Sequence, residues 1–392
     1  MKFVLAPDKY KGSLTGIEFC DAAEKGLRMV FADANIIKLP LADGGDGTIE
    51  VVKTYLNADS VELSVSDPLF RPIHSSYLLS DDKKTAFIEM SEASGYKLLN
   101  KSELNCMHTT SLGTGNLIFD ALNKGVQEII LGIGGSATND GGMGMGSALG
   151  FEFLDRDGNR LSPTGINLIN VVTIKKSSIH KGLANVKVNV ACDVSNPFYG
   201  PDGAAYVYGP QKGANPEEVK LLDMGLKNFA KVIKSELGID VQNINGCGAA
   251  GGLGGGAVAF LNARLKSGID LIKEISDFDN AIKDVDWVIT GEGRLDAQTL
   301  SGKTIAGVLS SAKRKGIPVA ALCGSVLLTP KEQDEAGLNY VVAVSKETES
   351  LEVAMKNSYG NLIQAAYNFG EQIIHKQLFF IALFIRNLDL LV

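Results

Sequence analysis

Acidic side chains follow several short apolar runs in this chain, at points where a strand would end and a loop would begin. Because open α/β sheets bind ligands beyond the carboxyl ends of their strands, carboxylates at such points are candidates for chemistry. They could hold Mg²⁺ together with substrate phosphates, or accept a proton from a substrate hydroxyl. Charged loop residues are commonly just exposed, so no single one identifies a site. The candidates are Asp8, Asp43, Asp46, Asp140, Asp193, Glu292 and Asp296.

Three glycine-dense blocks accompany these carboxylates, at residues 131–142, 246–256 and 290–299. Glycine suits places where the backbone turns tightly or approaches a ligand closely. Backbone N–H groups exposed in this way form nests that bind anions. Nests combined with carboxylates favour an enzyme that handles phosphate over a set of flexible linkers. Basic residues that could hold an anion are Lys9, Lys11, Arg71, Lys212, Arg294 and Lys303.

Two segments resemble known nucleotide-binding patterns, but the surrounding sequence departs from each pattern. Residues 297–304 nearly fit a P-loop, yet the expected strand ends at Thr290 and alanine replaces the first glycine. Residues 132–137 fit the G-x-G-x-x-A dinucleotide fingerprint, and Glu152 follows at about the right spacing. The segment from Thr138 to Gly142 interrupts the place where the fingerprint's helix should start, and its Asp140 would face a pyrophosphate.

Composition narrows the class of protein. The chain has 392 residues, 45% of them hydrophobic, and a net charge of −7, which gives no electrostatic footprint for nucleic acid or an anionic membrane. Its five cysteines and four histidines are scattered, so neither a disulfide framework nor a zinc site is expected. Reduced cysteines and a short N-terminal apolar run indicate a cytoplasmic protein. The apolar run 378–385 is too short to span a bilayer and favours a buried terminal helix or strand.

Apolar periodicity predicts alternating strands and helices, which is typical of an α/β protein. Thr15 and Glu18 form a capping-box pattern ahead of a helix, and residues 61–90 read as antiparallel strands. We expect residues 1–60 and 281–376 to form a parallel α/β domain, 61–280 an inserted mixed α/β domain with glycine-rich loops, and 377–392 an apolar tail. Predicted strands are 3–6, 35–39, 61–65, 76–79, 85–90, 128–133, 186–192, 204–208, 287–290, 319–323 and 340–344, and predicted helices include 110–123, 221–237, 303–315 and 329–337.

Six motifs occur in order along the chain: Ala-Pro-Asp-Lys-Tyr-Lys-Gly-Ser-Leu at 6–14, Ala-Asp-Gly-Gly-Asp-Gly-Thr at 42–48, and the segments 132–142, 192–197, 246–254 and 290–299. Together they resemble the bacterial glycerate kinase family of the two-domain type I. The likeness covers about residues 1–376, and the tail from Gln377 does not share it. Departures are small: Asp46 stands where glutamate is common, and Cys247 where alanine is common.

The resemblance implies ATP-dependent phosphorylation of D-glycerate by a two-domain α/β protein with one flavodoxin-like domain and an active site in the cleft between domains. It favours 2-phosphoglycerate over 3-phosphoglycerate as product and implies Mg²⁺ as cofactor. The partners are then small molecules, with no nucleic acid and no membrane, and a homodimer stays open.

A mechanistic hypothesis, motivated by the placement of motifs at strand ends, assigns roles to individual residues. Asp193 or Glu292 would bind Mg²⁺, and Asp296 or Asp8 would accept the hydroxyl proton, so that Asp296, Asp193 and Asp8 form the catalytic group. Arg71 or Lys9 would bind the substrate carboxylate, with Ser136 and Asn139 beside it. Nucleotide phosphates would be held by Gly134, Gly135, Gly251, Gly252, Gly254 and Lys303.

Two other classes of protein remain as alternatives. A nicotinamide-dependent oxidoreductase would use residues 132–137 to bind NAD(P)H and would need no ATP. A non-catalytic protein that binds small anions would use the same glycine nests without turnover. Neither explains why six motifs occur in order.

Overall fold

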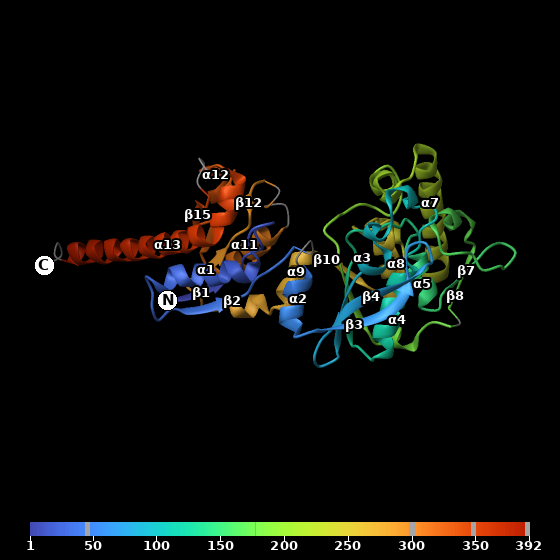
Figure 1. Ribbon diagram of the computed structural model, residues 1–392, viewed down its shortest axis with the longest axis horizontal. Coiled ribbons are helices and arrows are strands. Elements are labelled where there is room, and N and C mark those ends of the chain that lie inside the picture. Colours follow the sequence, from blue (N-terminus) through green and yellow to red (C-terminus); the bar gives the residue numbers. More distant parts are fainter. Residues whose placement is uncertain (44–47, 177, 298, 300–302, 346–349, 389–392) are drawn as a thin grey trace. The chain divides into compact units, whose positions relative to one another are not determined.

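The computed structural model describes residues 1–43, 48–176, 178–297, 299, 303–345 and 350–388, with only the backbone described for 376–388 (Figure 1). The chain divides into two compact units. Unit 1 comprises Met1–Val51 and Ile272–Val392, and unit 2 comprises Val52–Leu271.

Unit 1 is built on a five-stranded parallel sheet in the order β15-β13-β11-β1-β2. The chain leaves β1 toward β2 on one side, and leaves β11 toward β13 and β15 on the other. The strand order therefore reverses between β1 and β11, and such a switch point is where open α/β sheets bind ligands. The strands are β1 (Lys2–Leu5), β2 (Asn35–Lys38), β11 (Trp287–Thr290), β13 (Val319–Cys323) and β15 (Tyr340–Ala343), and a small parallel pair is formed by β12 (Arg294–Leu295) and β14 (Ser325–Val326).

Helices of unit 1 begin and pack as their residue types dictate. The Thr15 hydroxyl accepts the backbone N–H of Glu18, and the Glu18 carboxylate accepts the N–H of Thr15, which confirms the predicted capping box. The first helix packs against the last one so closely that a side chain at Gly26 would clash with the Ile363 carbonyl. The helices are α1 (Gly16–Arg28), α2 (Thr48–Leu56), α9 (Gly268–Ile275), α10 (Phe278–Ala281), α11 (Thr304–Lys315), α12 (Pro330–Ala336) and α13 (Leu351–Leu388), of which α2 and α9 cross the unit boundaries.

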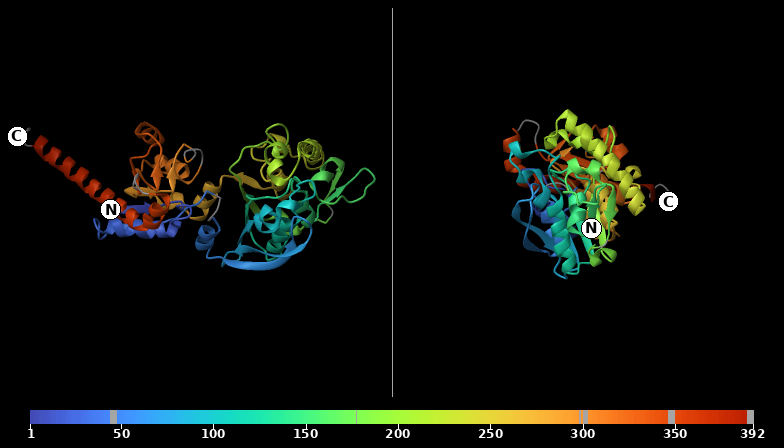
Figure 2. Two further views of the ribbon diagram at one scale, coloured as in Figure 1. Left: turned by 45° about the horizontal axis from the view of Figure 1, so that its top comes forward. Right: turned by 90° about the vertical axis from the view of Figure 1, so that its right-hand side faces the viewer.

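The apolar run 378–385 lies within α13, so its backbone is helical. Figure 2 shows that the last turns of α13 extend beyond the sheet of unit 1. Earlier in the same helix, Phe369 is buried against Trp287 of β11 and Tyr340 of β15, which anchors α13 on the sheet.

Unit 2 contains a six-stranded mixed sheet in the order β10-β9-β6-β5-β4-β3. The strands β3, β4 and β5 pair antiparallel, as the sequence predicts for residues 61–90, while β5, β6, β9 and β10 pair parallel. The α/β fold class is thus confirmed. The strands are β3 (Asp59–Ser66), β4 (Pro72–Leu79), β5 (Thr85–Glu89), β6 (Glu128–Gly132), β9 (Lys187–Ala191) and β10 (Arg264–Lys266), with a separate pair β7 (Glu152–Leu154) and β8 (Thr173–Lys175).

One predicted strand of unit 2 is wrong. Residues 204–208 form a short helix, in which Ala204 and Ala205 are buried while Tyr206 and Val207 are exposed. The aromatic and β-branched side chains favour a strand, but packing of the two alanines overrides that local preference. The helices of unit 2 are α3 (Ser91–Ser94), α4 (Leu112–Asn123), α5 (Met143–Ala148), α6 (Ala204–Tyr208), α7 (Pro216–Leu237) and α8 (Leu253–Leu261).

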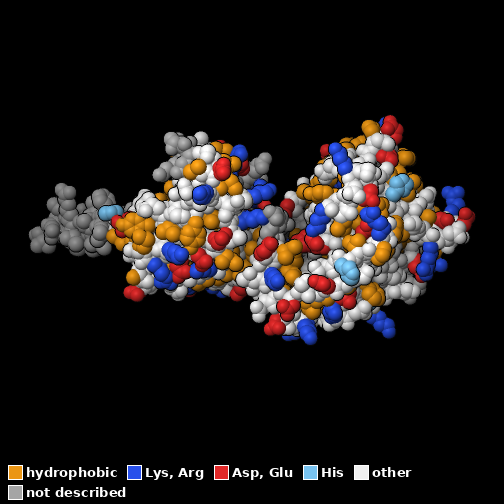
Figure 3. Space-filling model, viewed as in Figure 1, with side chains coloured by type: hydrophobic (Ala, Val, Ile, Leu, Met, Phe, Trp, Pro, Cys, Tyr) orange, Lys and Arg blue, Asp and Glu red, His pale blue; other side chains and the backbone are white. Residues whose placement is uncertain are grey.

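The surface carries mixed charge. On the face drawn in Figure 3, basic and acidic side chains are interspersed. Over the part of the chain that the structure describes, no helix is long and apolar enough to cross a membrane.

Candidate functional site

The carboxyl ends of β1 and β11 meet at the switch point of unit 1, and an acidic residue follows each strand. Asp8 follows β1, and Glu292 follows β11. The backbone N–H of Asp8 donates to the carbonyl oxygen of Gly291 at 2.8 Å, which ties the two loops together. The structure therefore brings these two predicted site residues to one edge of the sheet.

Asp8 is a carboxylate in a largely buried position. Its Oδ1 accepts the backbone N–H of Lys9 at 2.7 Å, and its Oδ2 accepts the hydroxyl of Thr304, the first residue of α11. Burial raises the pKa of Asp8 to about 6; the Thr304 hydroxyl opposes the rise, and the charge of Asp43 adds to it. A carboxylate with this pKa can exchange a proton with a substrate close to neutral pH.

Glu292 is the second carboxylate of this edge. Burial raises its pKa to about 7, against the hydrogen bond from Thr299, and the charge of Asp8 raises it further. Its Oε1 is buried and has no hydrogen-bond partner among the described residues. Because an unpaired buried acceptor costs about 1–3 kcal/mol, a cation or a donor bound at this oxygen would be stabilising.

Asp296 and Lys303 lie close to Glu292, since the charge of Lys303 lowers its pKa and that of Asp296 raises it. Asp296 belongs to a turn in which its Oδ1 accepts the N–H of Thr299 at 3.3 Å, and its Oδ2 pairs with Arg294 Nε at 3.1 Å. Lys303 is exposed and directly precedes α11. Asp8, Glu292, Asp296 and Lys303 therefore form one group, which we call the acidic edge.

The P-loop alternative is not supported by this geometry. A P-loop needs a strand that runs directly into the glycine turn, whereas residues 291–303 separate β11 from α11. Residues 298 and 300–302 of the pattern lie outside the described residues.

The acidic edge offers few side chains that could coordinate a metal ion. The described residues contain no group of three or more His, Cys, Asp and Glu side chains arranged to hold a metal ion. Mg²⁺ in phosphate-handling sites is commonly held by one or two carboxylates, with phosphates and water completing the shell. Glu292, with its unpaired oxygen, and Asp8 fit that smaller requirement. The candidate Asp46 lies outside the described residues.

The loop that follows β6 in unit 2 presents unpaired donors. Gly134 and Gly135 are exposed, and the amides of Gly134, Gly135 and Ser136 donate to no protein acceptor among the described residues. The loop is held from one side, where Tyr96 N–H donates to the Gly135 carbonyl at 3.0 Å and Ala137 N–H to the Ser94 carbonyl at 2.9 Å. We call residues 134–139 the donor loop.

Behind the donor loop lies a buried lysine, Lys212, which is 3% exposed. Its Nζ donates to Ser136 Oγ and to the Thr138 carbonyl oxygen, both at 2.7 Å. Both polar side-chain atoms of Asn139, and the hydroxyl of Thr138, are buried without a hydrogen-bond partner. The predicted binding residues Ser136 and Asn139 thus lie on a loop that contacts a buried ammonium group from a distant part of the chain.

The same loop does not form a dinucleotide site. The helix α5 begins at Met143, after Gly142 in the left-handed conformation, rather than within residues 134–137 as the fingerprint requires. The carboxylate of Asp140 is fully buried and accepts the N–H groups of Ser111, Gly142 and Gly144 as well as the Ser111 hydroxyl. Asp140 therefore fixes the backbone between the donor loop and α5.

The second glycine block packs against the first by backbone contact. A side chain at Gly251 would clash with the carbonyl of Thr138, and one at Gly252 would lie 3.0 Å from Gly141 Cα. Within the second block itself, a side chain at Gly254 would lie 2.6 Å from the carbonyl oxygen of Gly246. All three glycines are buried. Close approach of two chain segments is enough to explain why these positions are glycine.

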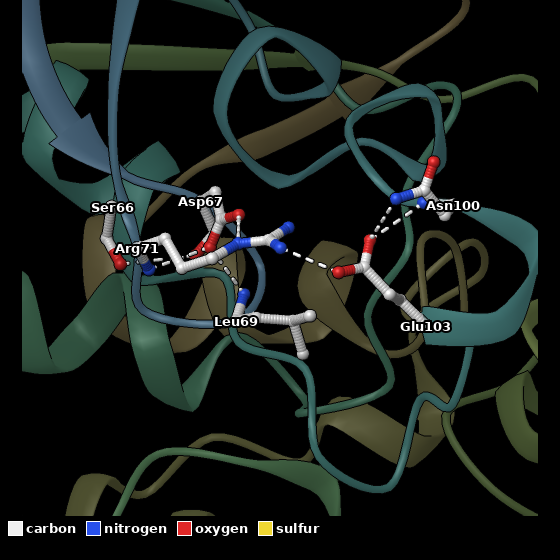
Figure 4. A network of polar contacts seen from close by, with 6 residues as sticks. All are labelled: Ser66, Asp67, Leu69, Arg71, Asn100 and Glu103. Carbon is white, nitrogen blue, oxygen red and sulfur yellow. Dashed lines mark hydrogen bonds and ion pairs between the residues drawn. The ribbon is translucent and has the colours of Figure 1, made fainter.

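Arg71, a predicted carboxylate binder, already holds two carboxylates (Figure 4). Its Nε pairs with Asp67 Oδ2 and its Nη1 with Glu103 Oε1, each at 2.6 Å. Asp67 is buried and also accepts the N–H groups of Leu69 and Arg71, so the arginine closes the turn between β3 and β4. A substrate carboxylate would add a third negative charge to a group that already carries a net charge of −1.

Of the remaining predicted residues, Asp193 lies in unit 2 and Lys9 lies at the acidic edge. Asp193, an exposed residue after β9, accepts the N–H of Gly268 at 2.9 Å, at the N-terminus of α9, where a negative charge is favourable. Lys9 lies beside Asp8, to which its backbone N–H donates.

Glu89, at the carboxyl end of β5, was not foreseen from the sequence. It pairs in register with Gly132, and a side chain at Gly132 would lie 2.5 Å from Glu89 Oε2. Burial raises the pKa of Glu89 to about 7, the charge of Glu92 adds to the rise, and that of Lys97 opposes it. Its position at a strand end beside the first glycine block was the available signal.

Comparisons with known proteins identify the family of this chain. The model of the glycerate kinase family matches residues 3–374. The chain is 44% identical to a glycerate kinase of Halalkalibacterium halodurans, over 93% of this chain and 96% of the relative, and 42% identical to the glycerate 2-kinase of Escherichia coli, over 94% and 97%. A crystal structure of a protein provisionally named glycerate kinase 2, from Salmonella typhimurium LT2, superposes with a TM-score of 0.87 at 42% identity, covering 96% of this chain and 99% of that one.

Proposed function

This chain belongs to the glycerate kinase family and is a kinase, and we propose that it transfers the γ-phosphoryl group of ATP to the 2-hydroxyl group of D-glycerate, with Mg²⁺ as cofactor. The acidic edge at the switch point of unit 1 carries this proposal, because it combines carboxylates of raised pKa with a lysine. The 2-hydroxyl is preferred because the Escherichia coli relative is named glycerate 2-kinase.

Glu292 and Lys303 would hold the phosphate end of the nucleotide. Bound Mg²⁺ supplies charge neutralisation at the β- and γ-phosphates. Glu292 offers it a carboxylate whose Oε1 has no other partner, and Lys303 offers its ammonium to phosphate oxygens. Phosphoryl transfer depends mainly on positioning and charge, so no covalent nucleophile is needed.

Asp8 is preferred over Asp296 as the group that accepts the hydroxyl proton. Its pKa of about 6 leaves it ionised at neutral pH and still able to take up a proton as the hydroxyl reacts. The Thr304 hydroxyl and the Lys9 N–H hold the carboxylate in one orientation. Asp296, by contrast, is engaged in its own turn and with Arg294.

The reaction is tested by ³¹P NMR of the protein with Mg-ATP and D-glycerate. We expect a new phosphomonoester signal that grows when authentic 2-phosphoglycerate is added and stays separate from added 3-phosphoglycerate. Growth of the 3-phosphoglycerate signal would overturn the choice of hydroxyl, and intact ATP would overturn the proposed reaction. We place the activity in the cytoplasm, in keeping with five cysteines that form no disulfide.

A further inference from the structure

The donor loop has more hydrogen-bond donors than acceptors to receive them. Lysine has three N–H donors, and Lys212 uses two, on Ser136 Oγ and the Thr138 carbonyl. Because Lys212 cannot accept, Ser136 Oγ acts as acceptor in that contact, and its own O–H has no acceptor among the described residues. The amides of residues 134–136 are unpaired as well.

Lys212 is held in place from its backbone. It ends a short 3₁₀ turn (Pro210–Lys212), its carbonyl accepts the N–H of Cys106 at 3.1 Å, and the next residue is Gly213 with φ +89°. A side chain at Gly213 would clash with the Leu104 carbonyl.

The ammonium is thus fixed beneath the donor loop, and no residue of the described chain forms an ion pair with it. The buried carboxylate of Asp140 acts on it electrostatically, but that carboxylate is already hydrogen-bonded to Ser111, Gly142 and Gly144. A buried charge without a directly paired counter-charge is costly, which points to a ligand that supplies one.

Two other side chains of the donor loop lack partners too. The Thr138 hydroxyl and both polar side-chain atoms of Asn139 are buried, and no group among the described residues forms a hydrogen bond with them. An amide side chain both donates and accepts, so Asn139 is matched to a hydroxyl group, whereas the ammonium, the Ser136 O–H and the amides are matched to an oxyanion. A molecule that carries a carboxylate next to a hydroxyl would satisfy both sets.

We propose that Lys212, acting directly and through the Ser136 hydroxyl, binds the carboxylate of a small 2-hydroxy acid at the donor loop, with Asn139 contacting the adjacent hydroxyl. This inference rests on the proposed function and assigns to Lys212 the task that the hypothesis from the sequence gave to Arg71 or Lys9. A nucleotide phosphate is the other source of an oxyanion, and the experiment distinguishes the two.

The test measures dissociation constants by calorimetry for wild type, Lys212→Met and Ser136→Ala, using D-glycerate, glycerol and ATP as separate probes. Methionine keeps most of the lysine volume and removes the charge. We expect Lys212→Met to weaken D-glycerate binding roughly 10- to 100-fold, because hydrogen bonds to charged groups are worth about 1.5–3 kcal/mol. Ser136→Ala should weaken it several-fold. The ATP constant should stay within about threefold, and glycerol, which lacks the carboxylate, should bind weakly to all forms.

The matched control is Lys220→Met, which removes an exposed lysine of α7 and should leave all three constants unchanged. D-glycerate binding by Lys212→Met within threefold of wild type would overturn the inference, and so would a loss confined to ATP. If wild type phosphorylates no glycerate, the proposed function fails. If wild type phosphorylates glycerate while Lys212→Met binds glycerate normally, only the inference about Lys212 fails.

A second readout uses wild type alone, in case Lys212→Met does not fold. Burial lowers the pKa of Lys212 to about 8, so D-glycerate binding should be constant below about pH 7 and weaken as the pH rises through 8 toward 10 and the ammonium loses its proton. The titratable groups that act on it are Cys106, whose pKa burial raises to about 11, and the hydrogen-bonded carboxylate of Asp140. Affinity that stays flat from pH 7 to 10 would contradict the assignment.

Discussion

The two sheets of this protein end in loops of opposite character. At the acidic edge of unit 1 the surplus groups are acceptors: Asp8 and Glu292 have raised pKa values, and a buried oxygen of Glu292 lacks a donor. At the donor loop of unit 2 the surplus groups are donors gathered around Lys212. Unpaired buried acceptors and unpaired buried donors both lower the stability of the folded protein. A ligand that supplies donors or positive charge to the acidic edge, or acceptors to the donor loop, would offset that loss.

The acidic edge and the donor loop differ in the kind of ligand that each can bind. An acceptor-rich edge suits a cation and a proton, whereas a donor-rich loop suits an oxyanion. A phosphoryl transfer between an acid substrate and a metal-bound nucleotide needs both kinds of site. The predictions below remove one feature of this contrast at a time, beginning with the largest expected effect.

Replacing Asp8 by Asn should abolish the proton acceptor while keeping the side-chain volume. We expect kcat to fall about 10²- to 10⁴-fold, the usual contribution of a positioned general base, with little change in the D-glycerate dissociation constant. Steady-state kinetics and calorimetry check this, with Asp33→Asn, an exposed carboxylate of the same unit, as control. Near-normal turnover of Asp8→Asn would remove the acidic edge from the reaction.

Gly251 of the second glycine block and Gly134 of the first should differ in how much they contribute to the stability of the protein. Gly251→Ala should destabilise the protein by about 3 kcal/mol or more, because φ is +69° and the methyl group would clash with the Thr138 carbonyl. Gly134→Ala should change the free energy of unfolding by less than about 1 kcal/mol, since nothing lies within 4 Å of its added methyl group. Denaturant unfolding of both variants measures this. Equal stability would contradict a packing role for Gly251.

Glu292→Gln should raise stability while weakening binding of the metal-nucleotide complex. The folded protein holds this proton more tightly than the unfolded chain, so ionisation destabilises the fold. That cost is absent below pH 4.5 and complete above about pH 7. We expect a gain of about 2–3 kcal/mol at pH 8 that disappears toward pH 4.5. Thermal unfolding at both pH values provides the measurement, and a loss of stability at pH 8 would be the contrary outcome.

Glu89→Gln is the counterpart in unit 2 of Glu292→Gln in unit 1, and its overall effect should be smaller because only stability should change. The same sign applies, since burial raises its pKa to about 7, so stability should rise at pH 8 and not at pH 4.5. Unlike Glu292, Glu89 should leave the affinity for Mg-ATP unchanged. A drop in that affinity would show that the nucleotide reaches the donor loop, and would blur the contrast between the two regions.

Local signals in the sequence predicted much of the fold. The capping box at Thr15, the strands of unit 1 and the antiparallel strands of residues 61–90 all depend on near neighbours, and each is confirmed. The short segment 204–208 failed because burial of two alanines against distant residues decided its conformation. Local patterns therefore identify the strand ends, but not every segment between them.

The candidate site could be predicted only in part for the same reason. Asp8 and Glu292 could be predicted to lie together because each follows a strand within a few residues, and parallel strands bring such positions to one edge of the sheet. Lys212 was one of six basic candidates, since its contact with Ser136 spans 76 residues and leaves no local trace. The ion pairs that occupy Arg71 depend on Asp67 and on the distant Glu103, so sequence spacing could not disclose that its charge was already in use.

The strand order of unit 1 has a consequence for how the protein is made. The strand β1 pairs with β11, whose residues are synthesised some 280 positions later. A ribosome therefore releases all of unit 2 before the sheet of unit 1 can close, and α13 must emerge before Phe369 can cover that sheet. Closing such a large loop is slow compared with local folding. We expect unit 2 to acquire its structure during translation while the N-terminal segment waits, with its hydrophobic strand available to chaperones until the chain is nearly complete.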